Sequence, residues 1–463
     1  MDRYDLVIIG SGAAGTSAAA AAVHFGASRV AIVEGGIMWG TCVNVGCIPS
    51  KFLLTLAGMQ YYRNYHHAGL SVDSRFDLPA ALAEKQTLID RLKRAKYDTL
   101  VKKLGVELVQ GTAEFRSPVE LQVGDRILGA EKIIIATGSS PSVPPIEGIR
   151  EVPFITSAGA LSPDHIPESL IIFGGRALGL EFAQIYAHLG TQVTVLQRSS
   201  RIIPEEEPEI SDLMEGYLAS ERMRIRTGVD IRKVKRAGDG ITVNTIIDGK
   251  ETDFFGEQLL LATGRTPNTS ALRLDRAGVK IAKNGAIIVD KTLKTSASHI
   301  WAAGDVTGEP MLETSARAGG EIAAMNAFSG KIRAFDRSAL PHGIYTSPQV
   351  AGVGMTEEKA ILAGLQVETR CISMDQLAKT AIAGDTRGTV KIIAERGTGR
   401  ILGVHICAPL ATEMIPAGVL AVKHRLSITD FADTLFVFPT ETEALLRCAR
   451  AFRGKDAGCG GIR

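Results

Sequence analysis

The feature that most constrains the fold is an apolar run, a glycine-rich turn, an alanine-rich run and a second apolar run at the start of the chain. Residues 4–34 are YDLVIIGSGAAGTSAAAAAVHFGASRVAIVE. A buried strand followed by a helix and a parallel strand forms a βαβ unit. Gly10, Gly12 and Gly15 at its turn would let a pyrophosphate approach the helix N-terminus, and Glu34 could bond a ribose hydroxyl pair. A glycine-rich turn without a ligand is the weaker alternative, because the whole unit is present.

A second copy of the pattern runs from Leu170 to Arg201, within SLIIFGGRALGLEFAQIYAHLGTQVTVLQRSSR. Gly174 and Gly179 hold the first and last glycine positions, and Arg176 stands at the middle one. Two βαβ openings predict an α/β fold with two Rossmann-like domains. Two dinucleotide sites in one chain suggest electron transfer between two cofactors.

The end of the second strand differs between the two copies. In the second copy it carries Gln197 and Arg198, with Arg201 close behind, where the first copy has an acid. An acid would bond a 2′-hydroxyl and repel a 2′-phosphate, whereas these residues favour the 2′-phosphate of NADPH. Solvated surface arginines are the alternative, and NADH stays possible as the donor.

Three further apolar runs end in small or acidic residues, at residues 133–145, 259–272 and 299–308. The first two carry Ala-Thr-Gly, and the third carries Gly-Asp. Open α/β sheets bind ligands at the carboxyl ends of their strands, so these segments should line the nucleotide sites. The expected contacts are Thr137, Gly138, Gly264 and Asp305.

Size and charge exclude several classes of function. The chain has 463 residues, 45% hydrophobic and 22% charged, which indicates about three domains of a soluble protein. A net charge of +2 gives no electrostatic case for a nucleic-acid or anionic-membrane partner. The first residues already form a strand, and no apolar run reaches the ~18 residues of a membrane span. We therefore expect a cytoplasmic protein, in which a disulfide is more often catalytic than structural.

Two of the six cysteines lie close together in GTCVNVGCIPSK, residues 40–51. Cys42 and Cys47 could form a redox pair, part of a zinc site or an inert buried pair. A structural zinc site needs about four ligands, and neither a CxxC motif nor clustered histidines lie near them in the sequence.

These motifs, in this order, resemble the FAD- and NAD(P)-dependent disulfide oxidoreductases, a family that includes glutathione reductase, lipoamide dehydrogenase and mercuric reductase. The resemblance covers nearly the whole chain. It implies an FAD-binding domain at residues 1–145 that returns at 269–335, and an NAD(P)H-binding domain at 146–268. Residues 336–463 would form a C-terminal α+β dimerisation domain that completes the active site of the other subunit in a homodimer.

The resemblance also assigns roles. Cys42 and Cys47 would form a redox-active disulfide, with Cys47 nearer the flavin and Cys42 facing the substrate. Lys51 would pair with Glu181 near the flavin N5 atom. Lys51 and the positive end of the helix that begins near Pro49 should lower the thiolate pKa. The cofactor-binding residues expected are Gly10, Gly12, Gly15, Glu34, Thr41, Lys51, Ala113, Thr137, Gly138, Asp305, Gly174, Gly179, Glu181, Gln197, Arg198 and Gly264.

The segment FVFPTETEALLRCARAF differs from most of the family at one decisive position. Where glutathione reductase and lipoamide dehydrogenase carry a histidine that acts as general base, this chain has Phe438, although Glu443 is retained as a candidate catalytic residue. A phenyl ring cannot take a proton from a thiol. Mercuric reductases also lack this histidine, and several stretches resemble that subgroup most.

A soft Hg(II) ion needs thiolates and no general base. The expected metal ligands are Cys42 and Cys47, with Cys459 of the tail delivering the ion from the partner subunit. Two departures from the subgroup stand out: a single tail cysteine, and phenylalanine at the two positions of its active-site tyrosines (Phe154 and Phe438). We also expect a form without the N-terminal metal-binding domain of the typical enzyme. Cys448 could serve as a second tail thiol, but its helical surroundings favour a core residue.

Three functions therefore compete. The first is an NADPH-dependent, FAD-containing Hg(II) reductase. The second is a reductase of another acceptor, such as a disulfide of the glutathione or lipoamide type, a quinone or a different metal ion. The third is a non-catalytic flavoprotein scaffold, which has no need for a dithiol.

Overall fold

The computed structural model describes residues 2–62, 69, 75–308 and 310–454. These residues belong to two compact units. Unit 1 consists of Met1–Ser50, Leu82–Ser142 and Gly264–Asp336, and unit 2 consists of Lys51–Ala81, Val143–Thr263 and Arg337–Arg463. Unit 2 holds residues 51–81 as well as most of the predicted NAD(P)H-binding and dimerisation segments. The domain boundaries and the role of each segment stay predictions.

Unit 1 is built on a seven-stranded sheet. Its strand order is β3-β2-β1-β6-β5-β4, and β16 pairs with β6. The strands β3, β2, β1, β6 and β16 are parallel, whereas β4, β5 and β6 form antiparallel hairpins. Their bounds are β1 (Asp2–Ile9), β2 (Val30–Glu34), β3 (Glu107–Gln110), β4 (Ala113–Ser117), β5 (Glu120–Val123), β6 (Arg126–Ile135) and β16 (Ile300–Ala302).

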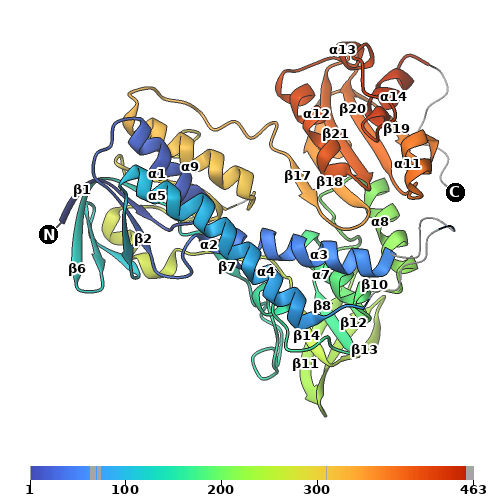
Figure 1. Cartoon of the computed structure of the whole chain (residues 1–463), viewed down its shortest axis with the longest axis horizontal. Coiled ribbons are helices and arrows are strands. Elements are labelled where there is room, and N and C mark those ends of the chain that lie inside the picture. Colours follow the sequence, from blue (N-terminus) through green and yellow to red (C-terminus); the bar gives the residue numbers. More distant parts are fainter. Residues whose placement is uncertain (1, 63–68, 70–74, 309, 455–463) are drawn as a thin grey trace. The chain divides into compact units, whose positions relative to one another are not determined.

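The first βαβ unit forms as the sequence predicts, because its central strand is buried on both faces and its helix is made of small residues. Leu6, Val7 and Ile8 are fully buried in β1, as expected of a parallel strand covered on both sides. The alanines of α1 (Ala13–His24) let α9 (Glu313–Phe328) pack closely beside it (Figure 1). A Cβ at Gly320 of α9 would lie 2.1 Å from the Ala14 carbonyl oxygen.

Shorter elements complete unit 1. A two-stranded ribbon pairs β7 with β15. Two helices, α3 and α4, contain residues of both units. The bounds are β7 (Ser139–Pro141), β15 (Arg265–Pro267), α2 (Gly40–Val45), α3 (Cys47–Tyr62), α4 (Leu78–Lys93), the π-helix η1 (Arg94–Asp98), α5 (Thr99–Leu104) and the 3-10 turns η2 (Ser270–Leu272), η3 (Leu274–Ala277) and η4 (Asp305–Thr307).

The second βαβ unit organises the first part of unit 2. A parallel sheet of order β10-β9-β8-β14 is accompanied by an antiparallel sheet of order β11-β12-β13. The bounds are α6 (Ser157–Ala160), β8 (Ser169–Phe173), α7 (Ala177–His188), β9 (Gln192–Leu196), α8 (Pro208–Ser220), β10 (Arg224–Arg226), β11 (Asp230–Ala237), β12 (Gly240–Ile247), β13 (Lys250–Gly256) and β14 (Gln258–Leu261).

The rest of unit 2 is a five-stranded antiparallel sheet of order β17-β18-β21-β20-β19. Helix α12 packs on β18 and β21, and α14 packs on β19 and β20 (Figure 1). The bounds are β17 (His342–Ile344), β18 (Gln349–Gly354), α10 (Glu357–Leu362), β19 (Val367–Ser373), η5 (Met374–Gln376), α11 (Ala378–Ala383), β20 (Thr389–Glu395), β21 (Ile401–Ala408), α12 (Ala411–Lys423), α13 (Ile428–Ala432) and α14 (Glu443–Ala451).

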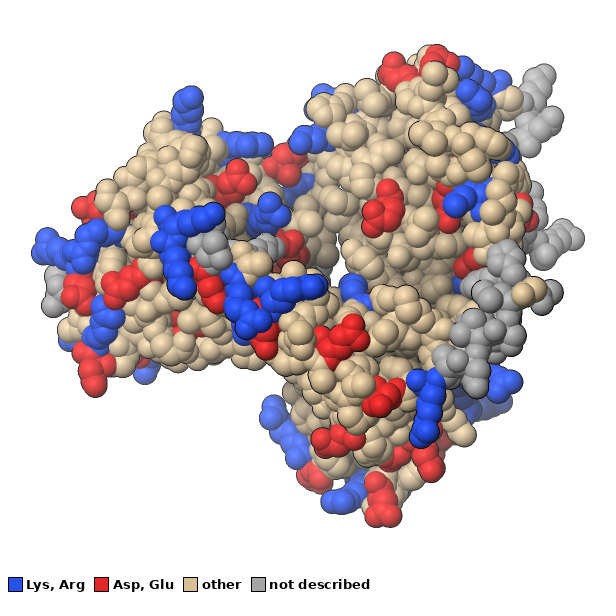
Figure 2. Space-filling model, in the orientation of Figure 1, with Lys and Arg blue, Asp and Glu red and all other residues tan. Residues whose placement is uncertain are grey.

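The surface and one apolar helix complete the description. Figure 2 shows basic and acidic side chains interspersed over the visible face. The helical segment Gly40–Tyr62 is long and apolar enough to cross a membrane by length and composition, although the sequence predicted no such span. A core helix of a soluble protein passes the same test, so this segment alone is weak evidence for a membrane.

Candidate active site

The two cysteines of GTCVNVGCIPSK are brought together by a break between two helices. Cys42 lies on α2, Cys47 is the first residue of α3, and Gly46 alone separates the helices. A Cβ at Gly46 would lie 2.9 Å from the Thr41 carbonyl oxygen and 3.1 Å from the Cys42 Cα, so the tight turn requires glycine. Both cysteines are half-buried and are not joined in a disulfide, and the Cys42 side chain hydrogen-bonds that of Cys47.

The Cys47 sulfur affects the protonation of Cys42. The hydrogen bond to Cys47, together with burial and the charge of Cys47, raises the pKa of Cys42. The prediction that helix and lysine would lower the thiolate pKa is therefore wrong for Cys42, because a neighbouring sulfur and burial outweigh them.

The glycines of the first fingerprint fit a bound dinucleotide. Gly10 has φ +108°, and a Cβ there would lie 2.3 Å from the Ala136 carbonyl oxygen. A Cβ at Gly15 would lie 1.9 Å from the Gly10 carbonyl oxygen. At Gly12 the nearest atom to an added Cβ is 3.9 Å away, and no side chain of the described residues caps α1 there. The first-turn N–H groups of α1 can therefore receive a pyrophosphate.

Glu34 holds this turn from the end of β2. Its Oε2 accepts hydrogen bonds from the Ser11 N–H at 2.9 Å and the Ser11 hydroxyl at 2.6 Å, and its Oε1 accepts one from the Gly36 N–H at 2.8 Å. The acid is thus fixed at the strand end, where a ribose would lie.

The remaining expected FAD contacts lie around the same sheet. Thr137 donates to the Asn268 carbonyl oxygen at 2.7 Å. Asp305 opens η4 after β16, and its Oδ2 accepts from the Ser139 hydroxyl at 2.6 Å. Other expected contacts are Thr41, exposed on α2, Ala113, buried at the start of β4, and Gly138 with φ +68°. Contact of any of these with FAD stays a prediction.

Sequence reasoning missed Arg265, which follows the Ala-Thr-Gly turn that contains Gly264. Its Nε donates to the Ser139 hydroxyl at 2.7 Å, its Nη2 donates to the Ser139 carbonyl oxygen at 2.6 Å, and its Nε lies 3.9 Å from Asp305 Oδ2. Burial lowers the pKa of Arg265, and the charges of Asp305 and Cys47 oppose that shift. The sequence signal that could have identified Arg265 is a basic residue directly after the Ala-Thr-Gly motif.

Lys51 and Glu181, which the resemblance pairs, form an ion pair in unit 2. The Lys51 Nζ lies 2.6 Å from Glu181 Oε2, and the Glu181 side chain is only 3% exposed. Glu181 Oε1 accepts from the Tyr345 N–H at 3.0 Å, and the Lys51 ammonium lies 4.6 Å from the centre of the Tyr345 ring. A buried carboxylate and an aromatic face together fix the lysine, although its position near a flavin stays a prediction.

The second fingerprint repeats the geometry of the first. Gly174 has φ +109°, and a Cβ there would lie 2.4 Å from the Ala262 carbonyl oxygen. A Cβ at Gly179 would lie 1.8 Å from the Gly174 carbonyl oxygen. Arg176, at the middle position, pairs with Glu205 at 3.6 Å and is more than half exposed.

Gln197 takes the place of Glu34 in this second copy. It is buried, and its Oε1 accepts from the Gly175 N–H at 2.7 Å, as Glu34 accepts from Ser11. Its Nε2 donates to the Ser199 hydroxyl at 2.9 Å, and the neighbouring Arg198 is exposed. The strand end thus keeps the acceptor that holds the turn but carries no negative charge.

Phe154 and the expected site residues near the C-terminus differ in their burial and in their contacts. Phe438 is 68% exposed, and Phe154 packs half-buried against the core of the part of unit 2 that contains β8 and β14. Glu443, retained from the family, is bound by Arg447 of its own helix at 2.7 Å. Cys448 is fully buried, and burial raises its pKa to about 12, which fits a core residue. Cys459 lies outside the described residues.

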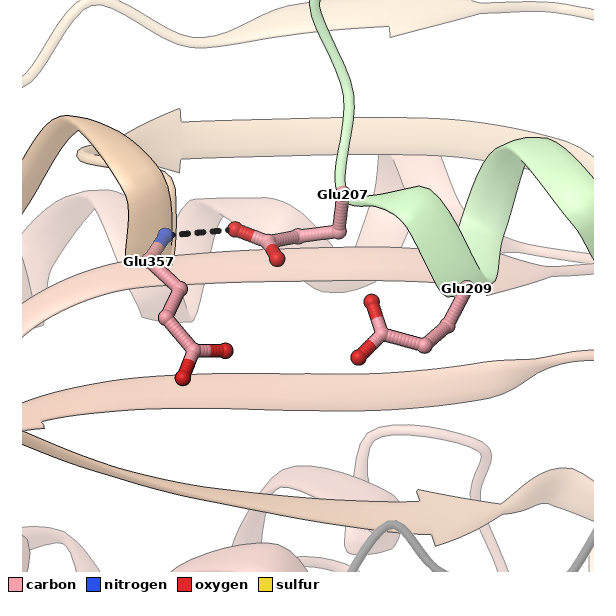
Figure 3. Close-up of side chains that lie close together, drawn as sticks. All are labelled: Glu207, Glu209 and Glu357. Atoms are coloured by element: carbon pink, nitrogen blue, oxygen red, sulfur yellow. Dashed lines mark hydrogen bonds between the residues drawn. The ribbon is translucent and has the colours of Figure 1, made fainter. Parts of the chain in front are cut away.

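One group of three carboxylates among the described residues has metal-ligand spacing: Glu207, Glu209 and Glu357 (Figure 3). The Lys391 ammonium lies 2.7 Å from Glu207, 3.0 Å from Glu209 and 2.7 Å from Glu357. Burial alone would lower the pKa of Lys391, but these hydrogen bonds outweigh it and raise the pKa. A lysine therefore already supplies the positive charge that this acidic cluster requires.

Known families match most of the chain. Residues 4–320 match the pyridine nucleotide-disulphide oxidoreductase model, and residues 340–449 match the dimerisation domain of the same family.

Known proteins of similar sequence or structure cover nearly the whole chain. A mercuric reductase of Streptomyces lividans is 40% identical, over 97% of this chain and 96% of its own length. One from Lysinibacillus sphaericus is 36% identical, over 97% of this chain and 83% of its own length. The solved Cu(II) complex of the HOCl-induced flavoprotein disulfide reductase RclA from Escherichia coli has a TM-score of 0.88 and 29% identity, with 97% and 100% of the two chains covered. With two glycine cradles, an adjacent cysteine pair and these matches, the chain belongs to the pyridine nucleotide-disulphide oxidoreductases, flavoproteins that use FAD and NAD(P).

Proposed function

We propose that the protein reduces Hg(II) to Hg(0) with electrons from NADPH. The observation that carries the proposal is the hydrogen-bonded pair of thiols, Cys42 and Cys47, in a chain that has Phe438 where a disulfide reductase needs a general base. The mercuric reductases that resemble the chain over nearly its full length support the same substrate.

The chemistry of the pair suits a soft metal ion. A soft metal ion such as Hg(II) displaces the proton of a thiol when it binds, so the site needs no general base of the kind that thiol–disulfide exchange uses. Cys42 would receive the ion and lose its proton on binding, and Cys47 would supply the second sulfur. Reduction of Hg(II) to Hg(0) consumes two electrons, the number that one hydride from NADPH provides. FAD, when bound, passes that electron pair from the nicotinamide to the cysteine site.

We further propose that Lys51 and Glu181 act as one unit beside the flavin. The buried Glu181 carboxylate and the Tyr345 ring hold the Lys51 ammonium in one position. A fixed cation favours negative charge that develops on a neighbouring ring during reduction. The placement of Lys51 and Glu181 beside the flavin is supported by the family resemblance alone.

NADPH is the proposed electron donor, with NADH as the poorer one. Gln197 holds the second fingerprint turn without the negative charge that Glu34 brings to the first. A 2′-phosphate is therefore not repelled there, and the exposed Arg198 can pair with it.

A homodimer in the cytoplasm is the proposed state of the protein. The dimerisation-domain match supports the dimer. Leu435, Val437 and Phe438 are 91%, 76% and 68% exposed in the segment before α14, and an apolar segment of this kind calls for a partner surface.

Reduction of another metal ion, such as Cu(II), is the second candidate function. The observation that favours it is the similarity to a disulfide reductase solved as a Cu(II) complex. A cysteine pair accepts either soft or borderline ions, so the pair alone does not choose between them.

A panel of electron acceptors tests the proposal. Purified holoenzyme is mixed with NADPH and either Hg(II) in excess small thiol, Cu(II), oxidised glutathione or oxidised lipoamide. We expect rapid NADPH oxidation and volatile mercury with Hg(II), and only background oxidation with the two disulfides. Turnover with a disulfide and none with Hg(II) would overturn the proposal, and turnover with Cu(II) alone would favour the second candidate.

A further inference from the structure

Cys371 lies on β19, an edge strand of the five-stranded sheet, and it is disulfide-bonded. Four other cysteines are not joined in a disulfide: Cys42, Cys47, Cys407 and Cys448. The sequence contains six cysteines, so Cys459 of the C-terminal tail is the one partner that elimination leaves for Cys371. Cys459 itself lies outside the described residues, but the chain that leads to it is held close to Cys371.

The end of α14 is fixed against β19. The Arg370 Nε donates to the Ala451 carbonyl oxygen at 3.3 Å, and the Arg370 guanidinium lies 5.2 Å from the centre of the Phe452 ring. The Cys448 thiol donates to the Arg370 carbonyl oxygen at 3.1 Å. Arg370 directly precedes Cys371, so the tail starts beside the strand that carries this cysteine.

The tail is long enough to reach Cys371. Successive side chains of a strand alternate in direction, so Cys371 points to the face of β19 opposite to that of Arg370. The tail must therefore pass around the outer side of β19, where no strand of the described residues pairs with it. Cys459 lies eight positions after Ala451, and eight extended residues span up to roughly 26 Å. A passage around one strand covers on the order of 10 Å.

We propose that Cys371 and Cys459 form a second redox pair, whose disulfide holds the C-terminal tail on β19 and whose opening releases the tail thiol. When the pair closes, the two cysteine thiols lose two electrons and two protons and form the S–S bond. A small-molecule disulfide takes up both and is reduced to two small thiols. Opening reverses these steps. Disulfides of cytosolic proteins are usually of this transient, redox-sensing kind.

The attachment of the tail makes this disulfide sensitive to small thiols. Cys371 is half-buried, so a small thiol can attack its sulfur. Because Arg370 holds the start of the tail, Cys459 is a partner on a short tether, with an effective concentration in the millimolar range. Small thiols at a similar concentration therefore compete with the bridge and open it. The released Cys459 can bind a soft metal ion, and only this last consequence rests on the proposed function.

Peptide mapping without a reducing agent tests the pair. Purified holoenzyme is exposed to 2-hydroxyethyl disulfide, its remaining thiols are alkylated, and it is digested with trypsin. Cleavage after Arg370 and Lys379 places Cys371 in one peptide, and cleavage after Lys455 places Cys459 in another. We expect mass spectrometry to find these two peptides joined by a disulfide. Millimolar small thiol, added before alkylation, should abolish the cross-link.

Two serine variants sharpen the test. In Cys371→Ser, Cys459 loses its partner and should instead carry one small thiol as a mixed disulfide. Cys448→Ser is the matched control, because it alters a buried cysteine next to the same strand. The serine hydroxyl can donate to the Arg370 carbonyl oxygen as the thiol does, so this variant should keep the cross-link.

The inference is overturned if Cys459 of the oxidised wild type is alkylated, carries a small thiol or is bridged to a different cysteine. A covalent dimer on a gel without reducing agent would overturn a bridge within one chain. Cys42 and Cys47 share one tryptic peptide of the same digest, residues 30–51. The absence of a disulfide in that peptide would count against the proposed function and would leave the Cys371–Cys459 pair standing.

Discussion

At the scale of the residue, the glutamate-rich turn PEEEPE, residues 204–209, is the part of the chain whose structure was least foreseeable. Glu206 and Glu207 are buried, and each meets basic side chains from the five-stranded sheet. His342 hydrogen-bonds Glu206, His405 lies 3.6 Å from it, and Lys391 binds Glu207. A run of acidic residues usually lies in solvent. Here the basic residues that pair with it are brought together only by the folded sheet.

Lys391 should be essential to this cluster. Its side chain is 2% exposed, so Lys391→Met would leave several carboxylates close together without a cation. We expect a loss of about 3 kcal/mol or more in the free energy of unfolding, measured by urea denaturation. Lys423→Met, at the exposed end of α12, is the control and should stay within about 0.5 kcal/mol of wild type. Equal stability of the two variants would contradict this account.

His342 should stabilise the fold in a pH-dependent way. Burial alone would lower the pKa of His342, but its hydrogen bond to Glu206 and the charge of Glu206 outweigh it and raise the pKa above the ordinary 6.5. The stabilisation is therefore fully present below pH 6.5 and is lost as pH rises through the raised folded-state pKa.

Urea denaturation of wild type and His342→Gln on both sides of that range measures the effect. We expect the stability difference between the two proteins to be largest in mildly acidic buffer and to shrink as the buffer becomes alkaline. A difference that is constant or grows with pH would show that Glu206 does not favour a charged His342.

At the scale of the element, the two βαβ units could be predicted almost completely from sequence. Gly10 and Gly174 adopt nearly the same φ, and Gly15 and Gly179 each approach the carbonyl oxygen of the first glycine in their turn in the same way. Local pattern sufficed because turn, helix and strand are neighbours in the sequence. The stacking of the Trp39 ring on the Tyr97 ring escaped prediction because the two residues lie far apart in the sequence, and a tryptophan gives no sign that it has positive φ.

The strand-end residue of the second unit should set the choice of nicotinamide nucleotide. In Gln197→Glu, the carboxylate can still accept the Gly175 N–H, as Glu34 accepts Ser11, but it would repel a 2′-phosphate. We expect the ratio of kcat/KM for NADPH to that for NADH to fall roughly tenfold or more, since such repulsion costs more than about 1.4 kcal/mol. Gln192→Glu, at the exposed start of the same strand, should leave the ratio unchanged. A ratio that does not move in Gln197→Glu would remove this strand end from cofactor selection.

At the scale of the whole molecule, the order of the motifs along the sequence was sufficient to predict the family and the cysteine pair. It was not sufficient to predict the function of the C-terminal tail. Cys42 and Cys47 are separated by a short segment that leaves little freedom. Glu443 shows what a match to a family position does not reveal. The residue is retained from the family, but its ion pair with Arg447 of the same helix became known only from the structure. Long-range partners decide the role of such residues.

The most direct test of the central claim compares Hg(II)-dependent NADPH oxidation in wild type, Cys42→Ser, Cys47→Ser and the buried control Cys448→Ser. If the pair on α2 and α3 is the site of reduction, both pair variants fall to the rate of NADPH oxidation without Hg(II). The control should keep wild-type turnover provided that it retains FAD. Undiminished Hg(II) reduction in either pair variant would contradict the account and move the chemistry away from these two sulfurs.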